Sequence, residues 1–238
     1  MDFEKKHQED LQRLRGFRLL DDDFMTKVFE DISCAELLLR IILNDEGIRV
    51  LEAHSQRGIK NLQGRSVRLD ILAVDEADRV YNIEVQRSDK GAGVKRARDN
   101  SSLIDANVTE PGDKYEKLNE TYVIFITEKD YYKAGKPVYV IRNMNLTLGL
   151  PFEDGTHILY VNGEYRDDSD IGKLMHDFNC TSAEEMNFDL MAERTRYLKE
   201  NPKGVGSMCK AMEELRVESR KEMAIEMAQS LYEQGVSI

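Results

Sequence analysis

Residues 65–87 read R-S-V-R-L-D-I-L-A-V-D-E-A-D-R-V-Y-N-I-E-V-Q-R, and apolar residues recur in this stretch at every second position. From Val67 to Ala73 and again from Tyr81 to Val85, the odd-numbered positions are the more apolar ones. This period of two is typical of β-strands that rest one face on a core. Because a short polar segment separates the two runs, the stretch predicts a β-hairpin.

Two registers of this hairpin can be drawn. If Val74 paired with Arg79, the apolar faces of the two strands would be split, because a shift of one residue turns a strand over. If Asp75 pairs with Arg79 instead, the loop has three residues, and Asp78 in that loop adopts a left-handed conformation. The second register keeps the apolar faces together, and it is the one we predict.

The predicted register brings two acidic side chains together. Asp70 then lies opposite Glu84 on the even-numbered face, which also carries Gln86. Directly opposed residues have Cα atoms about 4.5–5.5 Å apart, and two carboxylates held so close repel each other unless a proton or a cation lies between them. Such oxygen ligands suit a hard divalent ion. Acidic residues are also common on solvent-facing strands, so ordinary surface charge is the alternative.

The charge of the chain is unevenly distributed. The whole sequence carries a net charge of −11, which argues against non-specific binding of nucleic acid by the entire surface. Residues 57–98 nevertheless carry a net charge of +4, which leaves −15 for the rest. This basic excess surrounds the acidic pair, where a phosphate backbone would need it. The alternative is that these are ordinary solvated charges.

Composition indicates a globular protein. With 238 residues, of which 41% are hydrophobic and 33% charged, the chain can form one sizeable domain and an appendage. It contains no apolar run of membrane-spanning length, and its charged start is unlike a signal peptide. The three cysteines, Cys34, Cys180 and Cys209, are far apart and are expected to be reduced thiols. We therefore expect a cytoplasmic protein without membrane contact.

A short helix over residues 4–20 and two further helices are expected before the hairpin. The aspartates at 21–23 precede a helix of about ten residues, and one of them is expected to cap it. Residues 34–43 predict a second, mostly buried helix, with Glu36 near its start. The alternative to a metal-binding role for these acids is that they cap a helix or carry solvent-exposed charge.

Further elements are expected after the hairpin. A helix over residues 94–106 would carry Lys95, Arg96 and Arg98 on its early turns. The apolar run at 122–127 is typical of a central strand covered on both faces.

The C-terminal part of the chain is predicted to be largely helical. Residues 157–165 first suggest a small edge hairpin, because Asn162-Gly163 is a turn signal. The capping box at 181–184 then predicts a helix that continues to about residue 199. Residues 205–234 predict a long helix with a stripe of methionines, which can support a homodimer.

Several segments taken together resemble a known superfamily. The segments R-L-D-I-L-A-V-D, Y-N-I-E-V-Q, K-R-A-R and Y-V-I-F-I-T-E-K-D resemble the PD-(D/E)XK nucleases, and among them the Rpn-like branch of recombination-promoting nucleases and putative transposases. The resemblance implies an α/β fold with a restriction-endonuclease-like core, in which helices flank a mixed central sheet. It also implies a nuclease-like domain over residues 1–165 and a helical C-terminal extension over residues 166–238.

The resemblance implies roles for the hairpin residues. Asp70, Glu84 and Gln86 would be catalytic, and the two acids together with the backbone carbonyl of Val85 would bind Mg²⁺ or Mn²⁺. Gln86 stands where the superfamily usually has lysine. Glutamine can position a water molecule but supplies no charge, which leaves the rate and the metal preference in question.

The resemblance also implies roles for residues around the hairpin. Asp22 and Asp23 are equally plausible as an accessory acid, and Glu36 is a further candidate by position. Four cations near the site are expected to contact phosphate oxygens, with Arg98 preferred on the helix. They are Arg68, Arg87, Lys95 and Arg98.

The sequence thus predicts a divalent-metal-dependent DNA endonuclease that hydrolyses phosphodiester bonds and is linked to recombination or mobile elements. One alternative is a catalytically inactive protein of the same fold that binds DNA or a protein partner. A second is a defence or toxin-like effector whose substrate is not DNA. A homodimer formed through the C-terminal helix is a further expectation.

Overall fold

The computed structural model describes residues 3–60, 66–87, 92–108, 112 and 114–233. The chain divides into two compact units: Phe17–Thr195 form one, and Met1–Gly16 with Arg196–Ile238 form the other. The first unit contains the sheet and the candidate site. The predicted domain boundary after residue 165 stays a prediction.

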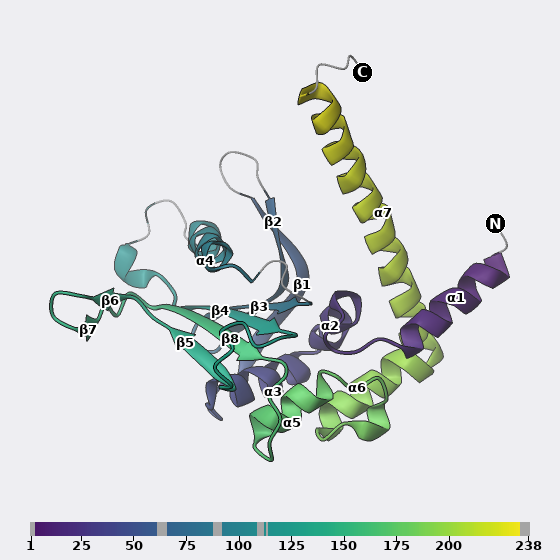
Figure 1. Cartoon of the computed structure of the whole chain (residues 1–238), viewed down its shortest axis with the longest axis horizontal. Helices are drawn as coiled ribbons and strands as arrows, with labels where there is room; N and C mark the ends of the chain where they lie inside the picture. The colour runs from purple at the N-terminus through teal and green to yellow at the C-terminus, as the bar shows by residue number, and fades with distance from the viewer. Residues whose placement is uncertain (1–2, 61–65, 88–91, 109–111, 113, 234–238) are drawn as a thin grey trace. The chain divides into compact units, whose positions relative to one another are not determined.

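A mixed six-stranded sheet forms the centre of the first unit (Figure 1), with the strand order β1-β2-β3-β4-β8-β5. Strands β1, β2 and β3 pair in antiparallel fashion, β3, β4 and β8 are parallel, and β5 is antiparallel to β8. The strands are β1 Val50–Lys60, β2 Ser66–Asp75, β3 Val80–Gln86, β4 Thr121–Thr127, β5 Val138–Ile141 and β8 Thr156–Asn162. This mixed sheet with flanking helices confirms the predicted α/β class.

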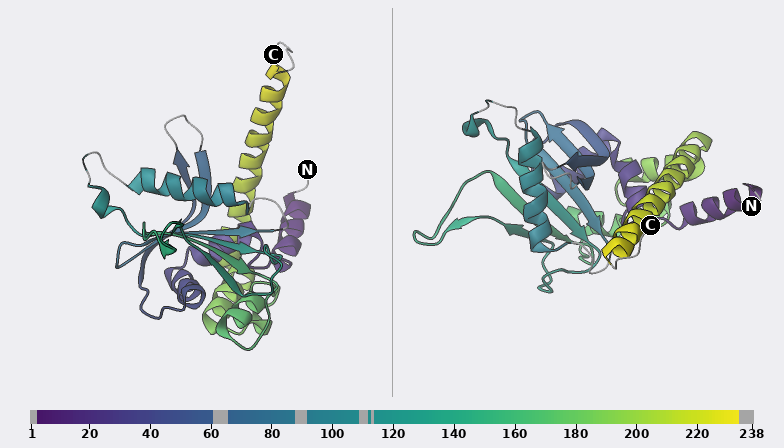
Figure 2. Two further views of the ribbon diagram at one scale, coloured as in Figure 1. Left: turned by 60° about the vertical axis from the view of Figure 1, so that its left-hand side comes forward. Right: turned by 90° about the horizontal axis from the view of Figure 1, so that it is seen from above.

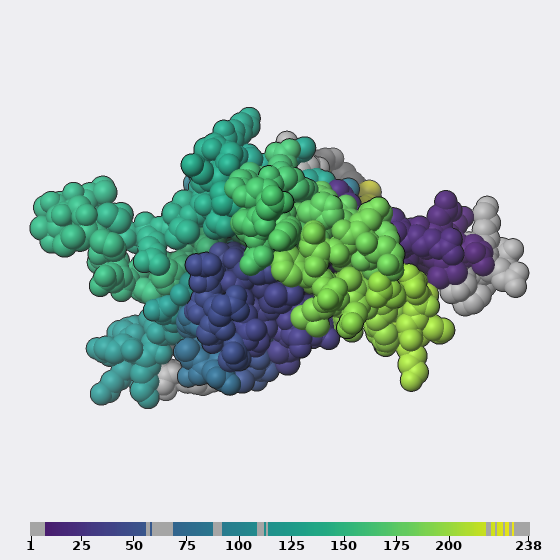
Figure 3. Space-filling view, turned by 90° about the horizontal axis from the view of Figure 1, so that it is seen from below, coloured from purple at the N-terminus to yellow at the C-terminus, as the bar shows by residue number. Residues whose placement is uncertain are grey.

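Helices cover both faces of the sheet. Helix α4 lies over one face, and α3 and α5 lie against the other (Figures 1 and 2). In the view of Figure 3, residues of α3 and α5 cover much of the surface, while the small β6–β7 hairpin projects from it. The helices are α2 Asp22–Phe29, α3 Ile32–Leu43, α4 Val94–Val108, α5 Asp170–Asp177 and α6 Asp189–Glu200; the short elements are η1 Tyr115–Lys117, η2 Ala183–Glu185, β6 Met144–Asn145 and β7 Leu150–Pro151.

The predicted hairpin register is confirmed as far as the strands are paired, and the predicted pair Asp70 and Glu84 lies just beyond the last pair. Strand β2 pairs with β3 from Val74↔Val80 to Ile71↔Ile83. The turn closes with a hydrogen bond of 3.2 Å from the Asp75 N–H to the Arg79 carbonyl. Asp78 has a φ of 58°, the left-handed conformation that the three-residue loop requires.

The even-numbered face of the hairpin faces α4. Leu72 and Val80 join a buried cluster with Leu103 and Ile104 of α4 and Phe125 of β4. Since side chains two residues apart on a strand share a face, the even-numbered acids of β2 and β3 also lie on the face that α4 covers. The hydrophobic packing of α4 therefore determines what surrounds these acids.

Two local predictions were wrong. Residues 156–162 are not an edge hairpin: β8 lies between β4 and β5, inside the sheet. The capping box at 181–184 does not open a long helix, since Ser182 caps the short η2 turn and α6 begins only at Asp189. Helix α5 begins at Asp170, where the Ser169 side chain accepts the Gly172 N–H at the N-cap.

In the second unit, α1 Phe3–Arg15 packs against α7 Pro202–Glu233. Leu14, Met208 and Met212 are buried there, and Arg216 forms an ion pair with Asp10. The long C-terminal helix predicted from the sequence is confirmed. No helix among the described residues is long and apolar enough to cross a membrane.

Candidate active site

Strands β2 and β3 part where Asp70 occurs. The paired residues end at Ile71↔Ile83, and beyond them the Asp70 Oδ2 atom accepts the backbone N–H of Val85 at 3.2 Å. A side-chain oxygen thus takes the hydrogen bond that a strand neighbour would otherwise make. Because the N–H and C=O of a residue in an extended strand point to the same side, the carbonyl of Val85 also faces β2.

Glu84 lies fully buried beside this opening. Its Oε2 atom is 2.6 Å from Nη2 of Arg96, and its Oε1 atom accepts the Asn82 Nδ2 at 3.1 Å. Asn100 donates its Nδ2 to Asn82 at 3.0 Å and lies 3.5 Å from Glu84 Oε1. Asn82 shares a strand face with Glu84, while Arg96 and Asn100 are four residues apart on one face of α4.

The carboxyl groups of the site perturb one another. Burial, and then the negative charges of Glu84 and Asp22, raise the pKa of Asp70 well above its usual value. Burial also raises the pKa of Glu84, although Arg96 and Asn82 oppose the shift. Asp22 is exposed to solvent, yet the surrounding protein and the charge of Asp23 raise its pKa, against the opposing charge of Arg87. The three carboxyl groups therefore share one electrostatic environment, in which the positive charges of Arg96 and Arg87 offset only part of the shift.

This donor set fits a hard divalent cation. The groups there that could bind a cation, the two carboxylates and the Val85 carbonyl, offer oxygen atoms, as Mg²⁺ and Mn²⁺ prefer. Within the described part of the chain, no donor is recorded for the second oxygen of Asp70, and the donors around Glu84 leave some of its lone pairs unused. A bound cation would relieve the repulsion that raises the pKa of each acid.

Two further predicted residues lie at the same end of the strands. Gln86 follows Glu84 by two residues, so it shares the face of Glu84; it is buried, and its carbonyl accepts the Glu128 N–H at 2.9 Å. Arg87 is exposed, and its Nη1 atom is 2.9 Å from Oδ1 of Asp21. Asp21 occupies the N-cap position of α2 without a side-chain capping bond.

The structure gives other surroundings to several predicted residues. Glu36 pairs with Arg40 and accepts the Val50 N–H at 2.9 Å, so it joins α3 to β1. The charge of Asp22 raises the pKa of both Asp70 and Glu84, and the charge of Asp23 raises the pKa of Asp22. Between the two aspartates that the sequence left equal, the electrostatics favour Asp22.

The predicted phosphate-binding cations differ in their positions. Lys95 and Arg98 are exposed on α4, and the side chain of Arg68 lies outside the described residues. Among the early cations of α4, it is Arg96 rather than Arg98 that reaches Glu84.

Arg96, Asn82 and Asn100 are site residues that the sequence reasoning missed. A signal was present, because Arg96 and Asn100 stand at helical spacing from the buried Leu103 and Ile104. A polar residue on the buried stripe of a helix requires a partner, and the even-numbered face of the hairpin offers one.

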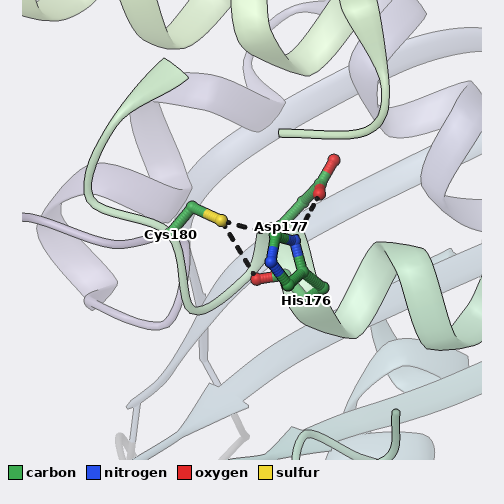
Figure 4. A group of neighbouring side chains, drawn as sticks. All are labelled: His176, Asp177 and Cys180. Carbon is green, nitrogen blue, oxygen red and sulfur yellow. Dashed lines mark hydrogen bonds and ion pairs between the residues drawn. The ribbon is translucent and has the colours of Figure 1, made fainter. Parts of the chain in front are cut away.

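A second group of metal-ligand residue types lies at the end of α5 (Figure 4), where His176, Asp177 and Cys180 come within 4.8 Å of one another. Its hydrogen bonds explain it without an ion. Both oxygens of Asp177 accept the N–H of Asn187, at 2.8 and 2.9 Å, and the Phe188 N–H adds a bond of 3.0 Å. Burial, and then the charge of Asp177, raise the pKa of Cys180 to about 11, so its thiol stays protonated.

A mixed sheet flanked by helices, with an acid on each of two neighbouring strands, is consistent with a nuclease-like protein of the PD-(D/E)XK class. The sequence matches the family described as PD-(D/E)XK nuclease family transposase over residues 36–165, and the chain belongs to that family. No curated protein and no solved structure matches the chain significantly. PD-(D/E)XK nucleases generally use divalent metals. The predicted superfamily is thereby confirmed, whereas the narrower Rpn-like assignment stays a prediction.

Proposed function

We propose that this protein is a divalent-metal-dependent DNA endonuclease that acts in recombination or in the movement of genetic elements. The observation that carries the proposal is the convergence of Asp70 and Glu84 where β2 and β3 part, with Asp22 adding to the negative charge. Buried negative charge is costly for folding. A site that binds a cation gives a functional reason for keeping such charge.

In this proposal, Asp70, Glu84 and the carbonyl of Val85 hold Mg²⁺ or Mn²⁺. The bound ion supplies charge stabilisation for the phosphate and lowers the pKa of a water molecule. Gln86 orients the attacking water through its amide, since it offers both a donor and an acceptor. Arg96, at 2.6 Å from Glu84, balances part of the negative charge and holds the carboxylate in place.

The cations around the site are proposed to bind the phosphate backbone of DNA. Arg87, Lys95 and Arg98 are exposed and can approach phosphate oxygens, and Arg68 is the fourth candidate. Because these contacts are electrostatic, DNA binding should weaken as the salt concentration rises.

Metal-dependent cleavage of plasmid DNA tests the proposal. Purified protein is expected to nick or linearise the plasmid in Mg²⁺ or Mn²⁺, to stop when EDTA removes the ion, and to leave RNA of the same sequence intact. The Glu84→Gln variant, which keeps the size of the buried side chain, should not cleave. Undiminished cleavage by this variant would remove the assignment. DNA binding without cleavage, and without heat of metal binding in calorimetry, would instead support the inactive DNA-binding alternative.

We also propose that α7 mediates a homodimer. Its C-terminal half exposes several apolar side chains, which commonly mark an interaction surface: Val217, Met223, Ile225 and Met227. Light scattering is expected to give twice the monomer mass of 27.4 kDa. Met223→Glu should return the protein to the monomer mass, whereas Leu148→Glu, an equal change on an exposed apolar residue outside the helix, should not. A monomeric wild type would refute the dimer.

A further inference from the structure

A row of aromatic side chains crosses the sheet from the candidate site. Glu84 is in register with Phe125 of β4, Phe125 with Tyr160 of β8, and Tyr160 with Tyr139 of β5. Residues in register on neighbouring strands point to the same face. The Phe125 and Tyr160 rings stack at 5.5 Å, and the Arg96 guanidinium lies 6.0 Å from the centre of the Phe125 ring. The row is therefore continuous with the surroundings of Glu84.

Two exposed tyrosines end this row. Tyr131 and Tyr132 follow β4, and their side chains are 41% and 39% exposed. Tyr131 stacks on Tyr160 with the ring centres 4.7 Å apart, and Tyr132 meets the same ring edge-on at 5.4 Å. We call Tyr131, Tyr132 and Tyr160 the aromatic platform. Neighbouring exposed rings that rest on a buried ring offer a flat apolar surface on which another ring can stack.

The Asp130 carboxylate accepts several hydrogen bonds within the loop that carries the platform. Asp130 accepts the N–H groups of Tyr132 at 3.1 Å, Lys133 at 3.0 Å and Gly135 at 2.7 Å. It also accepts the hydroxyl of Tyr139 at 2.8 Å. These bonds fix the backbone on either side of the tyrosines, so a ligand would meet rings that are already ordered. Pre-ordering of this kind reduces the entropic cost of binding.

The platform holds an unsatisfied polar group. The ring of Tyr160 is 1% exposed, and its hydroxyl has no hydrogen-bond partner among the described residues. Burial, Tyr131 and Tyr132 raise the pKa of Tyr160, so the hydroxyl stays neutral. A buried hydroxyl without a partner is costly, which sets Tyr160 apart from an ordinary core residue.

Charge and distance favour a nucleic-acid strand as the ligand. Lys133 and Lys136 are exposed in the same loop, next to the tyrosines in sequence. Basic side chains interleaved with stacking rings are typical of surfaces that bind single strands. Tyr160 lies two strands from Glu84, which is about 10 Å at the usual strand spacing. This span is about three nucleotides at the roughly 3.4 Å rise per nucleotide in DNA.

We propose that the aromatic platform stacks an unpaired base of the DNA strand whose phosphodiester bond is presented to Asp70 and Glu84. The proposal rests on the proposed nuclease function and narrows its substrate. A base inside an intact duplex has both faces covered by its neighbours, so it cannot lie on a tyrosine ring. The preferred substrate is therefore DNA with a single-stranded segment close to the cleavage point, such as an overhang, a flap or a loop.

Binding of fluorescent oligonucleotides in EDTA tests the proposal without any need for cleavage. The full-length protein is expected to bind a single-stranded oligonucleotide more tightly than a blunt duplex with closed hairpin ends. Tyr131→Ala with Tyr132→Ala should weaken single-strand binding by about 5- to 150-fold per stacked base and leave duplex binding unchanged. Tyr131→Phe with Tyr132→Phe should retain the wild-type affinity, because phenylalanine keeps the stacking face.

Two controls separate stacking from damage to the fold. Tyr115→Ala removes a ring that is 88% exposed in η1. Because η1 precedes β4 and the platform tyrosines follow it, this variant should bind both the single strand and the duplex as the wild type does. The wild type should bind an oligonucleotide with one abasic position more weakly than the intact oligonucleotide. The double alanine variant should bind the two oligonucleotides equally. Equal single-strand affinity of the wild type and the alanine variant would overturn the platform, as would an equal loss of duplex binding. If the protein passes these tests but never cleaves DNA, the proposed nuclease function is refuted and the proposed base stacking stands.

Discussion

The Asp70→Asn variant is expected to lose at least ~10³-fold of the metal-dependent DNA cleavage and, when free of metal, to be more stable than the wild type at neutral pH. Both effects have one cause. Asparagine keeps the size of the side chain and an oxygen that can accept the Val85 N–H, now 3.2 Å from Asp70 Oδ2. It removes the negative charge that a metal needs and that Glu84 and Asp22 repel.

The pH dependence of stability should distinguish the two proteins. Burial and the charges of Glu84 and Asp22 raise the pKa of Asp70, so the folded wild type binds more protons than the unfolded chain above about pH 4. Its free energy of unfolding therefore falls as pH rises from that point through the raised pKa. The Asp70→Asn variant has no carboxyl group at this position, so this fall in the free energy of unfolding does not occur. At neutral pH we therefore expect Asp70→Asn to have the higher free energy of unfolding and the higher Tm.

Calorimetric scans at pH 5 and pH 8, with EDTA or with Mg²⁺, measure these differences. Mg²⁺ should raise the Tm of the wild type but not that of Asp70→Asn, because a ligand stabilises only the state that binds it. Asp168→Asn, which neutralises an exposed acid outside the site, is the matched control and should leave cleavage and the metal response unchanged. A metal-free Asp70→Asn protein less stable than the wild type at pH 8 would contradict the electrostatic account of the site.

The hairpin at the centre of the site could be predicted because its determinants are local. Alternating apolar residues set the two faces, and Asp78 at a φ of 58° closes the loop that fixes the register. Once the register is known, strand geometry predicts that Asp70 and Glu84 lie near each other, although the strand pairing itself ends at Ile71↔Ile83. The sequence was therefore sufficient for the acidic pair.

The surroundings of the pair depend on tertiary packing, and there the sequence was less informative. Lys95, Arg96 and Arg98 are adjacent cations on α4, and only the orientation of the buried helix face decides which of them meets Glu84. Arg96 does so because it lies on the same side of α4 as the buried Ile104. The sequence analysis considered only charge and position, and it preferred Arg98 as the helix cation at the site.

The wrong predictions have the same origin. The turn signal Asn162-Gly163 is local, but the insertion of β8 between β4 and β5 is set by pairing with distant segments. The start of α6 is delayed because Asp177 binds the backbone N–H groups of Asn187 and Phe188, which fixes the preceding segment in a non-helical path. The capping box at 181–184 is a local pattern, so it could not indicate that Asp177 would bind these backbone groups.

The turn of the same hairpin gives a second large effect, on stability. Asp75 is 1% exposed and accepts four groups: the N–H of Ala77 at 3.0 Å, the N–H of Arg79 at 2.9 Å, the Nε of Arg79 at 2.7 Å and the hydroxyl of Tyr81 at 2.8 Å. Burial by itself would raise the pKa of Asp75, but these donors and the Arg79 charge outweigh it and hold the pKa below its usual value. The carboxylate therefore ties the turn to both strands.

Asp75→Ala leaves Arg79 and the buried Tyr81 hydroxyl without their partner, and we expect it to lower the free energy of unfolding by about 3–5 kcal/mol, or roughly 6–20 °C in Tm. Urea unfolding measures the loss, and Glu76→Ala, an exposed acid in the same turn, should change stability by less than about 0.5 kcal/mol. Because the pKa of Asp75 is lowered, its contribution is complete above about pH 4 and disappears as the pH falls through the folded value. The gap between wild type and Asp75→Ala should therefore narrow in acid, and an unchanged gap there would show that the carboxylate acts by packing and not by charge.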